Sequence, residues 1–71
     1  MANELKDKGN KAFAVKNYDL AIDLFSQALE LDPTNHVLFS NRSAAHAGNR
    51  EWDRALNDAE QVFIPPLSII D

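Results

Sequence analysis

Several side chains could do chemistry, but their spacing does not fit a catalytic or metal site. His36 and His46 lie ten residues apart, without a cysteine or a paired acid at ligand spacing, so we expect no metal. The serines have no nucleophile context, and no glycine-rich phosphate loop occurs. Four aspartates remain, which we expect to be solvated on helix surfaces or turns: Asp19, Asp23, Asp53 and Asp58. The sequence therefore predicts a protein that is not an enzyme and needs no cofactor.

Charge is distributed unevenly along the 71 residues, although the net charge is only −4. Residues 1–16 contain four lysines and two acids, whereas the rest of the chain contains three arginines and nine acids. An acidic chain without a basic stripe binds nucleic acid poorly, so we expect no nucleic-acid partner. The basic start of the chain suits an anionic peptide, or it is only a solvated helix face.

Length and hydropathy predict a small soluble domain. No run approaches the roughly 18 to 20 apolar residues that cross a bilayer, so we expect no membrane partner. Residues 1–8 are highly charged and lack the apolar core of a secretory signal. We therefore expect a cytoplasmic protein with a single domain over residues 1–71.

Apolar spacing and helix-breaking residues predict four helices, at about 3–15, 18–31, 36–47 and 51–63. Asn17 is a suitable N-cap for the second helix, and Pro33 breaks the chain after it. Thr34 or Asn35 can cap the third helix.

The turn between the third and fourth helices contains Gly48 and Asn49, which we expect to end the third helix with positive backbone angles. We expect Trp52 to pack as an aromatic just after this turn. Because all the turns are short, successive helices run antiparallel. The predicted fold is all-α, with two stacked helix-turn-helix hairpins.

A repeat of about 34 residues organises the chain. The positions where two helices must touch, and the proline that follows them, are Gly9, Ala21, Phe25, Ala28 and Pro33. When the sequence is shifted by 34 residues, Tyr18 aligns with Trp52 and Ala21 aligns with Ala55. The match weakens where the phenylalanine falls on Ala59. We expect repeat one at about 2–35, repeat two at about 36–63 and an irregular apolar tail at 64–71.

These positions resemble the signature of the tetratricopeptide repeat family. In the first repeat the matching residues are Leu5, Lys8, Gly9, Ala12, Ala21, Phe25, Ala28 and Pro33. The second repeat matches more loosely, at Phe39, Arg42, Ser43, His46, Ala55, Ala59 and Val62. Residues 3–12 and 35–45 are similar to the first repeat domain of the Hsp-organising, or stress-inducible, co-chaperones. The resemblance covers residues 2 to about 62 and implies a protein-binding module.

The resemblance further implies a partial carboxylate clamp for the C-terminal Glu-Glu-Val-Asp tail of heat-shock chaperones. Lys6, Asn10 and Asn41 stand at the matching positions. Lys6 and Asn10 are four residues apart and share a helix face, and an ammonium with two amides can satisfy a carboxylate. Phe13 could provide an apolar wall for the valine of the peptide.

The chain departs from this family pattern at its end. The resembled groove has a third hairpin with two further basic clamp residues, and Asp71 stands at the first of these positions. We expect the loss of such charge-assisted hydrogen bonds to weaken peptide binding.

The last residues are unusually apolar for a repeat terminus and include Val62, Phe63, Ile64, Leu67, Ile69 and Ile70. They could fold back over the fourth helix or mediate self-association into a homo-oligomer. The alternative function is therefore a self-associating assembly element with weak or no peptide binding. The sequence leaves open which chaperone is bound and whether two repeats suffice.

Overall fold

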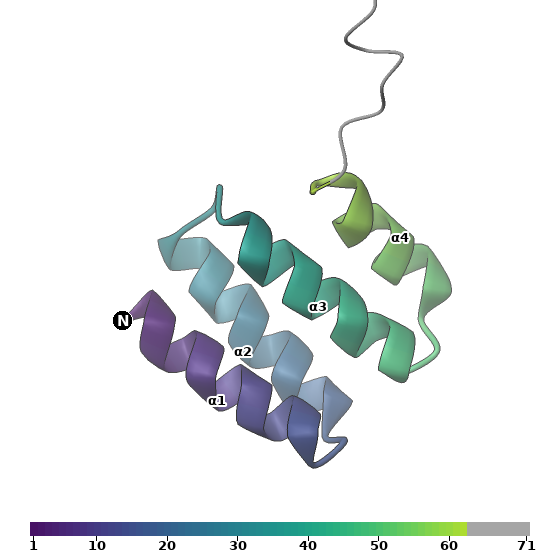
Figure 1. Cartoon of the computed structure of the whole chain (residues 1–71), viewed down its shortest axis with the longest axis horizontal. Coiled ribbons are helices and arrows are strands. Elements are labelled where there is room, and N and C mark those ends of the chain that lie inside the picture. Colours follow the sequence, from purple (N-terminus) through teal and green to yellow (C-terminus); the bar gives the residue numbers. More distant parts are fainter. Residues whose placement is uncertain (63–71) are drawn as a thin grey trace, which may run out of the picture.

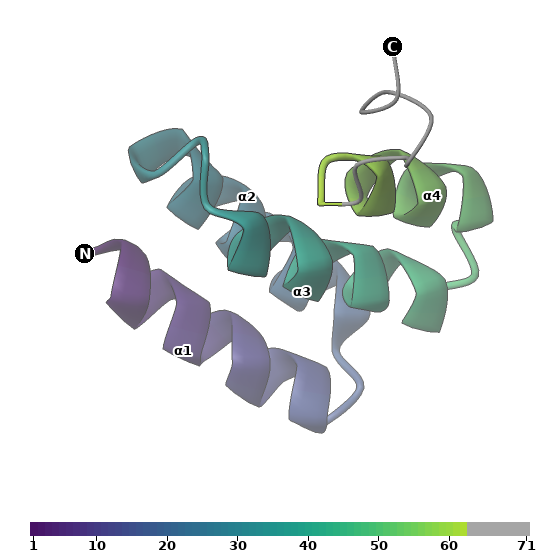
Figure 2. The ribbon, with the colours of Figure 1, turned by 45° about the horizontal axis from the view of Figure 1, so that its top comes forward.

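The computed structural model describes residues 1–62 and shows four helices. They are α1 (Ala2–Ala14), α2 (Tyr18–Leu31), α3 (His36–Gly48) and α4 (Trp52–Glu60). Each helix packs against the next one in the chain, and α1 also touches α3, so two hairpins stack side by side (Figure 1). Figure 2 shows α2 behind α1 and α3, so the first helices of the two hairpins share one face. The predicted all-α architecture is confirmed, and α4 ends before its predicted end.

The turns within the two hairpins have the same backbone geometry. Lys16 (φ 64°) and Arg50 (φ 61°) both adopt the left-handed conformation, at corresponding positions of the repeat. The next residue closes each turn. The Asn17 N–H donates to the carbonyl oxygen of Ala12, five residues earlier, at 2.8 Å, and the Glu51 N–H donates to that of His46 at 2.8 Å. This bonding pattern is the Schellman type of helix end.

The expectation that Gly48 and Asn49 would take positive backbone angles is therefore wrong. Asn49 has φ −89°, and neither glycine of the described residues has a positive φ. The left-handed residue is Arg50, because the closing hydrogen bond requires that conformation immediately before the residue that donates it.

Gly48 instead allows an aromatic ring to approach the backbone. A Cβ atom on Gly48 would collide with the ring of Tyr18 on α2. Gly9 has the same relation to Phe25, whose Cε1 would lie 2.6 Å from an added Cβ. Each glycine therefore lets a ring from α2 lie against a neighbouring helix, one on α1 and the other on α3.

Local side-chain hydrogen bonds fix the starts of α2 and α3. The Asn17 side chain accepts from the Leu20 N–H at 3.4 Å, as predicted for this N-cap. The Asn35 side chain accepts from the Val37 N–H at 3.0 Å, so Asn35 rather than Thr34 caps α3.

The apolar core lies between α1, α2 and α3. Phe25 and Leu38 are its largest fully buried side chains. The other members are small or medium in size: Ala12, Ala21, Ala28, Leu29 and Ala45. Small residues at these positions let the helices approach closely, as the repeat spacing predicts.

A polar network joins α3 to α4. The Arg42 guanidinium binds Asp58 with two hydrogen bonds of 2.7 Å, and its third nitrogen donates to Ser26 on α2 at 3.1 Å. His46 lies between two carboxylates, with Nδ1 2.9 Å from Glu51 and Nε2 3.6 Å from Asp58. Asp58 is only 2% exposed, so the expectation that it would be solvated is wrong.

The outer face of α4 is exposed in the described residues. Trp52 is 63% exposed and Leu56 is 61% exposed, so the expectation that Trp52 would be a packing aromatic is wrong. The corresponding residue of the first repeat, Tyr18, packs against α3, whereas no described helix follows α4 within residues 1–62.

Candidate peptide-binding site

Asn10 on α1 and Asn41 on α3 come together. These two helices lie on the same side of the molecule in Figure 2. The Asn41 amide Nδ2 donates to the Asn10 side-chain oxygen at 3.4 Å. Asn10 is exposed and Asn41 is half-buried, so both amides are accessible to a ligand. Two residues that lie 31 positions apart in sequence thus form one polar pair.

A small cavity of about 100 Å³ opens beside this pair. Besides the two asparagines, its lining consists of Phe13, Phe25 and Ala44. The Phe13 ring is 37% exposed and makes an edge-to-face contact with Tyr18, with ring centroids 5.5 Å apart. This contact fixes the ring at one wall of the cavity. The predicted apolar wall therefore lies next to the predicted polar pair.

Lys6 is half-buried and lies one turn before Asn10 on α1. Residues four apart share a helix face, so the lysine stem starts on the same side as the amide. No salt bridge within residues 1–62 involves Lys6. Its ammonium can therefore donate all three protons to a ligand carboxylate or to water.

Arg42 directly follows Asn41, but its charge is directed elsewhere. Its guanidinium contacts Asp58 and Ser26, and it lies 5.6 Å from the centroid of the Phe39 ring. This arginine joins the hairpins rather than adding charge to the asparagine pair.

Two cavity residues, Phe25 and Ala44, were not predicted as part of the site. Ala44 follows Asn41 by three residues, a spacing that places both on one face of α3. The Phe25 contribution depends on how α2 packs between α1 and α3, which no local pattern indicates.

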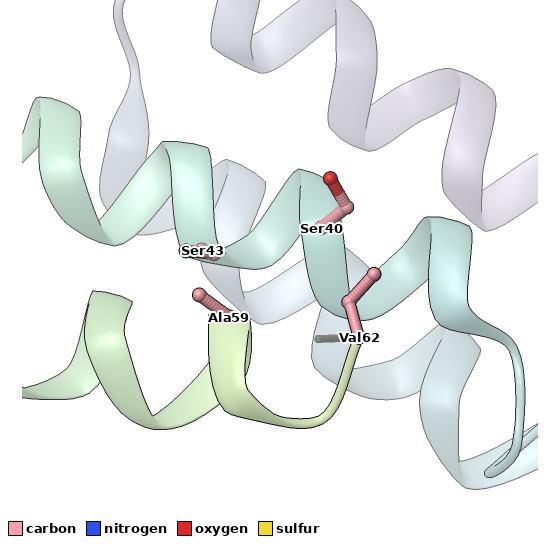
Figure 3. Close-up of a pocket in the computed structure, with 4 residues that line it drawn as sticks. All are labelled: Ser40, Ser43, Ala59 and Val62. Atoms are coloured by element: carbon pink, nitrogen blue, oxygen red, sulfur yellow. The ribbon is translucent and has the colours of Figure 1, made fainter. Parts of the chain in front are cut away.

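The predicted self-association residues lie mostly outside the described part of the chain. Val62 is described and is 36% exposed. It lines a second cavity, of about 320 Å³, with Ser40, Ser43 and Ala59 between α3 and the end of α4 (Figure 3). The other predicted residues fall outside residues 1–62: Phe63, Ile64, Leu67, Ile69, Ile70 and the clamp-position residue Asp71.

Metal binding and membrane crossing are two other possible roles of residues 1–62. No three histidine, aspartate or glutamate side chains gather there in a way that could hold a metal ion. Over the same residues, no helix combines the length and apolar character needed to cross a membrane.

Residues 2–35 match the family model of the tetratricopeptide repeat. The chain belongs to the tetratricopeptide repeat family. The described fold agrees with a solved structure, the Sgt2 TPR domain from Aspergillus fumigatus, with a TM-score of 0.84 and 43% sequence identity. That match covers 86% of this chain and 40% of the other.

Curated relatives of this tetratricopeptide repeat chain include organising proteins of heat-shock chaperones. The chain is 54% identical over 62 residues to Hsp70-Hsp90 organizing protein 2 of Arabidopsis thaliana, which covers 87% of this chain. It is 56% identical over 59 residues to the heat shock protein sti1 homolog of Schizosaccharomyces pombe, which covers 83% of it. The chain spans only 11% and 10% of the lengths of these two relatives.

Proposed function

We propose that this tetratricopeptide repeat chain is a peptide-binding module that holds the acidic C-terminal tail of heat-shock chaperones, which ends in Glu-Glu-Val-Asp. The observation that supports this proposal most is the Asn10–Asn41 pair beside a cavity walled by Phe13. The relatives named for organising Hsp70 and Hsp90 support the choice of partner. The module acts by binding and not by catalysis.

The terminal carboxylate of the peptide would lie between the two asparagine amides and the Lys6 ammonium. At 3.4 Å, the hydrogen bond between Asn41 and Asn10 is long, so exchanging it for a ligand bond costs little. Hydrogen bonds to a charged acceptor contribute about 1.5–3 kcal/mol each. An ammonium and two amides supply the donors that a carboxylate needs.

Phe13 would contact the valine next to the terminal aspartate. The cavity of about 100 Å³ is large enough for a few methyl groups and has aromatic walls on α1 and α2. Burying a methyl-sized group contributes about 0.8 kcal/mol. The terminal carboxylate would therefore provide most of the affinity. The contact with Phe13 would add specificity for valine at the position before the terminal aspartate.

Titration with a fluorescent peptide that ends in Glu-Glu-Val-Asp tests this proposal. We expect binding of the free acid, about tenfold weaker binding after Lys6→Ala or Asn41→Ala, and little binding of the same peptide with an amidated C-terminus. Added salt should weaken the binding because it screens the ammonium.

Matched variants separate the clamp from general effects. Asn57→Ala removes an exposed asparagine on α4, and Lys11→Ala removes an exposed lysine on α1 that does not line the cavity. Both should bind the peptide like the unmodified chain. Equal binding of the acid and amide peptides, or no effect of the Lys6 and Asn41 substitutions, would refute the clamp.

Self-association is the second candidate function, and the exposed face of α4 favours it. Trp52 and Leu56 lie one turn apart on this face and are both mostly exposed. Exposed neighbouring apolar side chains of this size are typical of association surfaces. A mass equal to one chain across a wide range of concentrations would exclude the homo-oligomer.

A further inference from the structure

The repeat register relates the two ends of the described chain to the contact between its hairpins. Inside the chain, α2 of the first hairpin packs against α3 of the second. Arg42 donates to Ser26 across this contact at 3.1 Å, and Asn49 donates to Asp19 at 2.9 Å. Shifted by one repeat, α2 corresponds to α4 and α3 corresponds to α1. The outer surfaces of α4 and α1 are thus the counterparts of two surfaces already joined within the molecule.

The α4 surface is apolar and edged with acid. Trp52 and Leu56 occupy the positions of Tyr18 and Ile22, and both are exposed where the α2 residues are half-buried. Glu60 occupies the position of Ser26 and is also exposed. A partner of α4 should therefore present apolar groups together with a cation.

The α1 surface offers such a combination. A shallow groove of about 530 Å³ runs between α1 and α2, with an apolar floor that includes Leu20 and Leu24. Lys8 and Lys11 form part of its lining. Lysine stems cover apolar surface while the ammonium groups stay in water, so the groove is apolar with a basic edge.

Lys8 lacks the acid that its counterpart has. It corresponds to Arg42, whose partner Asp58 is replaced by Leu24 in the first repeat. No salt bridge within residues 1–62 involves Lys8. A carboxylate from outside the described chain can therefore pair with it.

We propose that two copies of the chain stack head to tail, with α4 of one copy in the α1–α2 groove of the next and Glu60 facing Lys8. This inference rests on the proposed self-association and identifies its two surfaces. The Arg42–Ser26 hydrogen bond is the template, because the same register places Lys8 of one copy opposite Glu60 of the other. The two surfaces differ from each other, so the contact is heterologous and can continue from copy to copy.

The contact between two copies should be weaker than the contact between the two hairpins of one chain, because one residue of α1 is larger than its counterpart on α3. Ala14 stands at the position of Gly48, where even a Cβ atom would collide with the Tyr18 ring. The Ala14 methyl group therefore keeps the Trp52 ring of the next copy farther from α1. Replacing Ala14 by glycine should allow closer approach and strengthen the association.

Charge reversal tests the contact by sedimentation of the full chain over a wide range of concentrations at low salt. Lys8→Glu and Glu60→Lys should each weaken association about tenfold, since each creates a like-charge pair. The double variant should restore association, and so should mixing the two single variants. Ala14→Gly should strengthen association. Asp23→Lys is the matched control, because it reverses an exposed charge on α2 that does not line the groove.

Each result is informative. A monomer at every concentration would exclude both self-association and this contact. An oligomer that ignores both single reversals, or that the double variant fails to restore, would exclude this contact while leaving self-association in place. Weakening by Glu60→Lys alone would indicate a contact between two α4 helices instead. Since Lys8 and Glu60 are exposed, circular dichroism should show unchanged helicity in every variant.

Discussion

The hairpins α1–α2 and α3–α4 share a turn and differ in what fills the space between their helices. In the first, the Phe25 ring lies against Gly9. In the second, the corresponding residues are Ala59 and Ser43, and both line a cavity of about 320 Å³ (Figure 3). The Ser43 hydroxyl compensates in part by donating to the Ala55 carbonyl at 2.7 Å. One helix pair is thus closed by an aromatic ring and the other by a hydrogen bond next to a void.

The two hairpins also differ in their ionic groups, because the ion pair lies in the second hairpin and the aromatic ring lies in the first. Arg42 and Asp58 form a half-buried ion pair between α3 and α4, whereas the corresponding residues of the first hairpin are Lys8 and Leu24. The two hairpins therefore reach the same backbone arrangement through different interiors. The left-handed turn residue and the small residues at helix contacts set this backbone, and the larger side chains decide how strongly each hairpin is held.

Among the substitutions considered, Asp58→Ala should lower the free energy of unfolding most. The substitution leaves Arg42 without its carboxylate and removes one of the two acids beside His46. Breaking a buried pair costs about 3–5 kcal/mol, and partial exposure of the arginine should reduce this to about 2–3 kcal/mol. Urea unfolding followed by circular dichroism measures the loss. The exposed Asp53→Ala should change stability by less than about 0.5 kcal/mol.

A double substitution can give the second hairpin the two residues that the first hairpin has in place of the ion pair. Arg42→Lys with Asp58→Leu reproduces the pair Lys8 and Leu24. A lysine at position 42 can extend its ammonium into water, as the exposed Lys8 does, and the leucine fills the space that alanine would leave, so the double variant should be more stable than Asp58→Ala. A double variant less stable than the single one would show that the second hairpin cannot accept an apolar interior.

Sequence reasoning predicted the fold wherever the responsible chemistry is local. The cap at Asn17 and the break at Pro33 act on neighbouring backbone groups, and the predicted range of α2 agrees with the observed one. Arg50 was missed as the left-handed residue because glycine is the usual choice there. Asp58 was missed because its partner lies sixteen residues away on another helix. Trp52 was misplaced because its burial depends on what covers α4.

The candidate site was predicted through resemblance and not through spacing. Asn10 and Asn41 lie 31 residues apart, and their contact follows from the stacking of α1 and α3. Periodicity places each asparagine on a helix face but does not indicate that the two faces meet. The cavity beside them could not be predicted, because Phe25 reaches it from α2.

Filling the cavity between α3 and α4 should change the free energy of unfolding by an intermediate amount. Ala59→Phe alone should destabilise the chain, because the Ser43 side chain stands where Gly9 accommodates the Phe25 ring. Adding Ser43→Gly creates that space, so we expect a favourable coupling of about 1 kcal/mol between the two substitutions. A double-mutant cycle of unfolding free energies measures it, and strictly additive effects would show that the two hairpins do not share this packing geometry.

The smallest effect on stability is expected at the N-cap of the second helix of each hairpin. This residue is Asn17 in the first hairpin and Glu51 in the second. The Asn17 side chain caps α2, whereas Glu51 makes no side-chain cap and binds His46 instead. This hydrogen bond holds the pKa of Glu51 below its ordinary value of 4.5. A lowered pKa stabilises the fold above pH 4.5, and this contribution is lost as the pH falls through the lower value.

Replacing Glu51 by asparagine should transfer the cap of the first hairpin to the second and remove this pH dependence. Near neutral pH the stability should change little, because the gained cap offsets the lost contact with His46. Below pH 4.5 the variant should lose less stability than the unmodified chain, as measured by urea midpoints over an acid pH series. Equal losses in the two chains would mean that the His46 contact does not depend on the charge of Glu51.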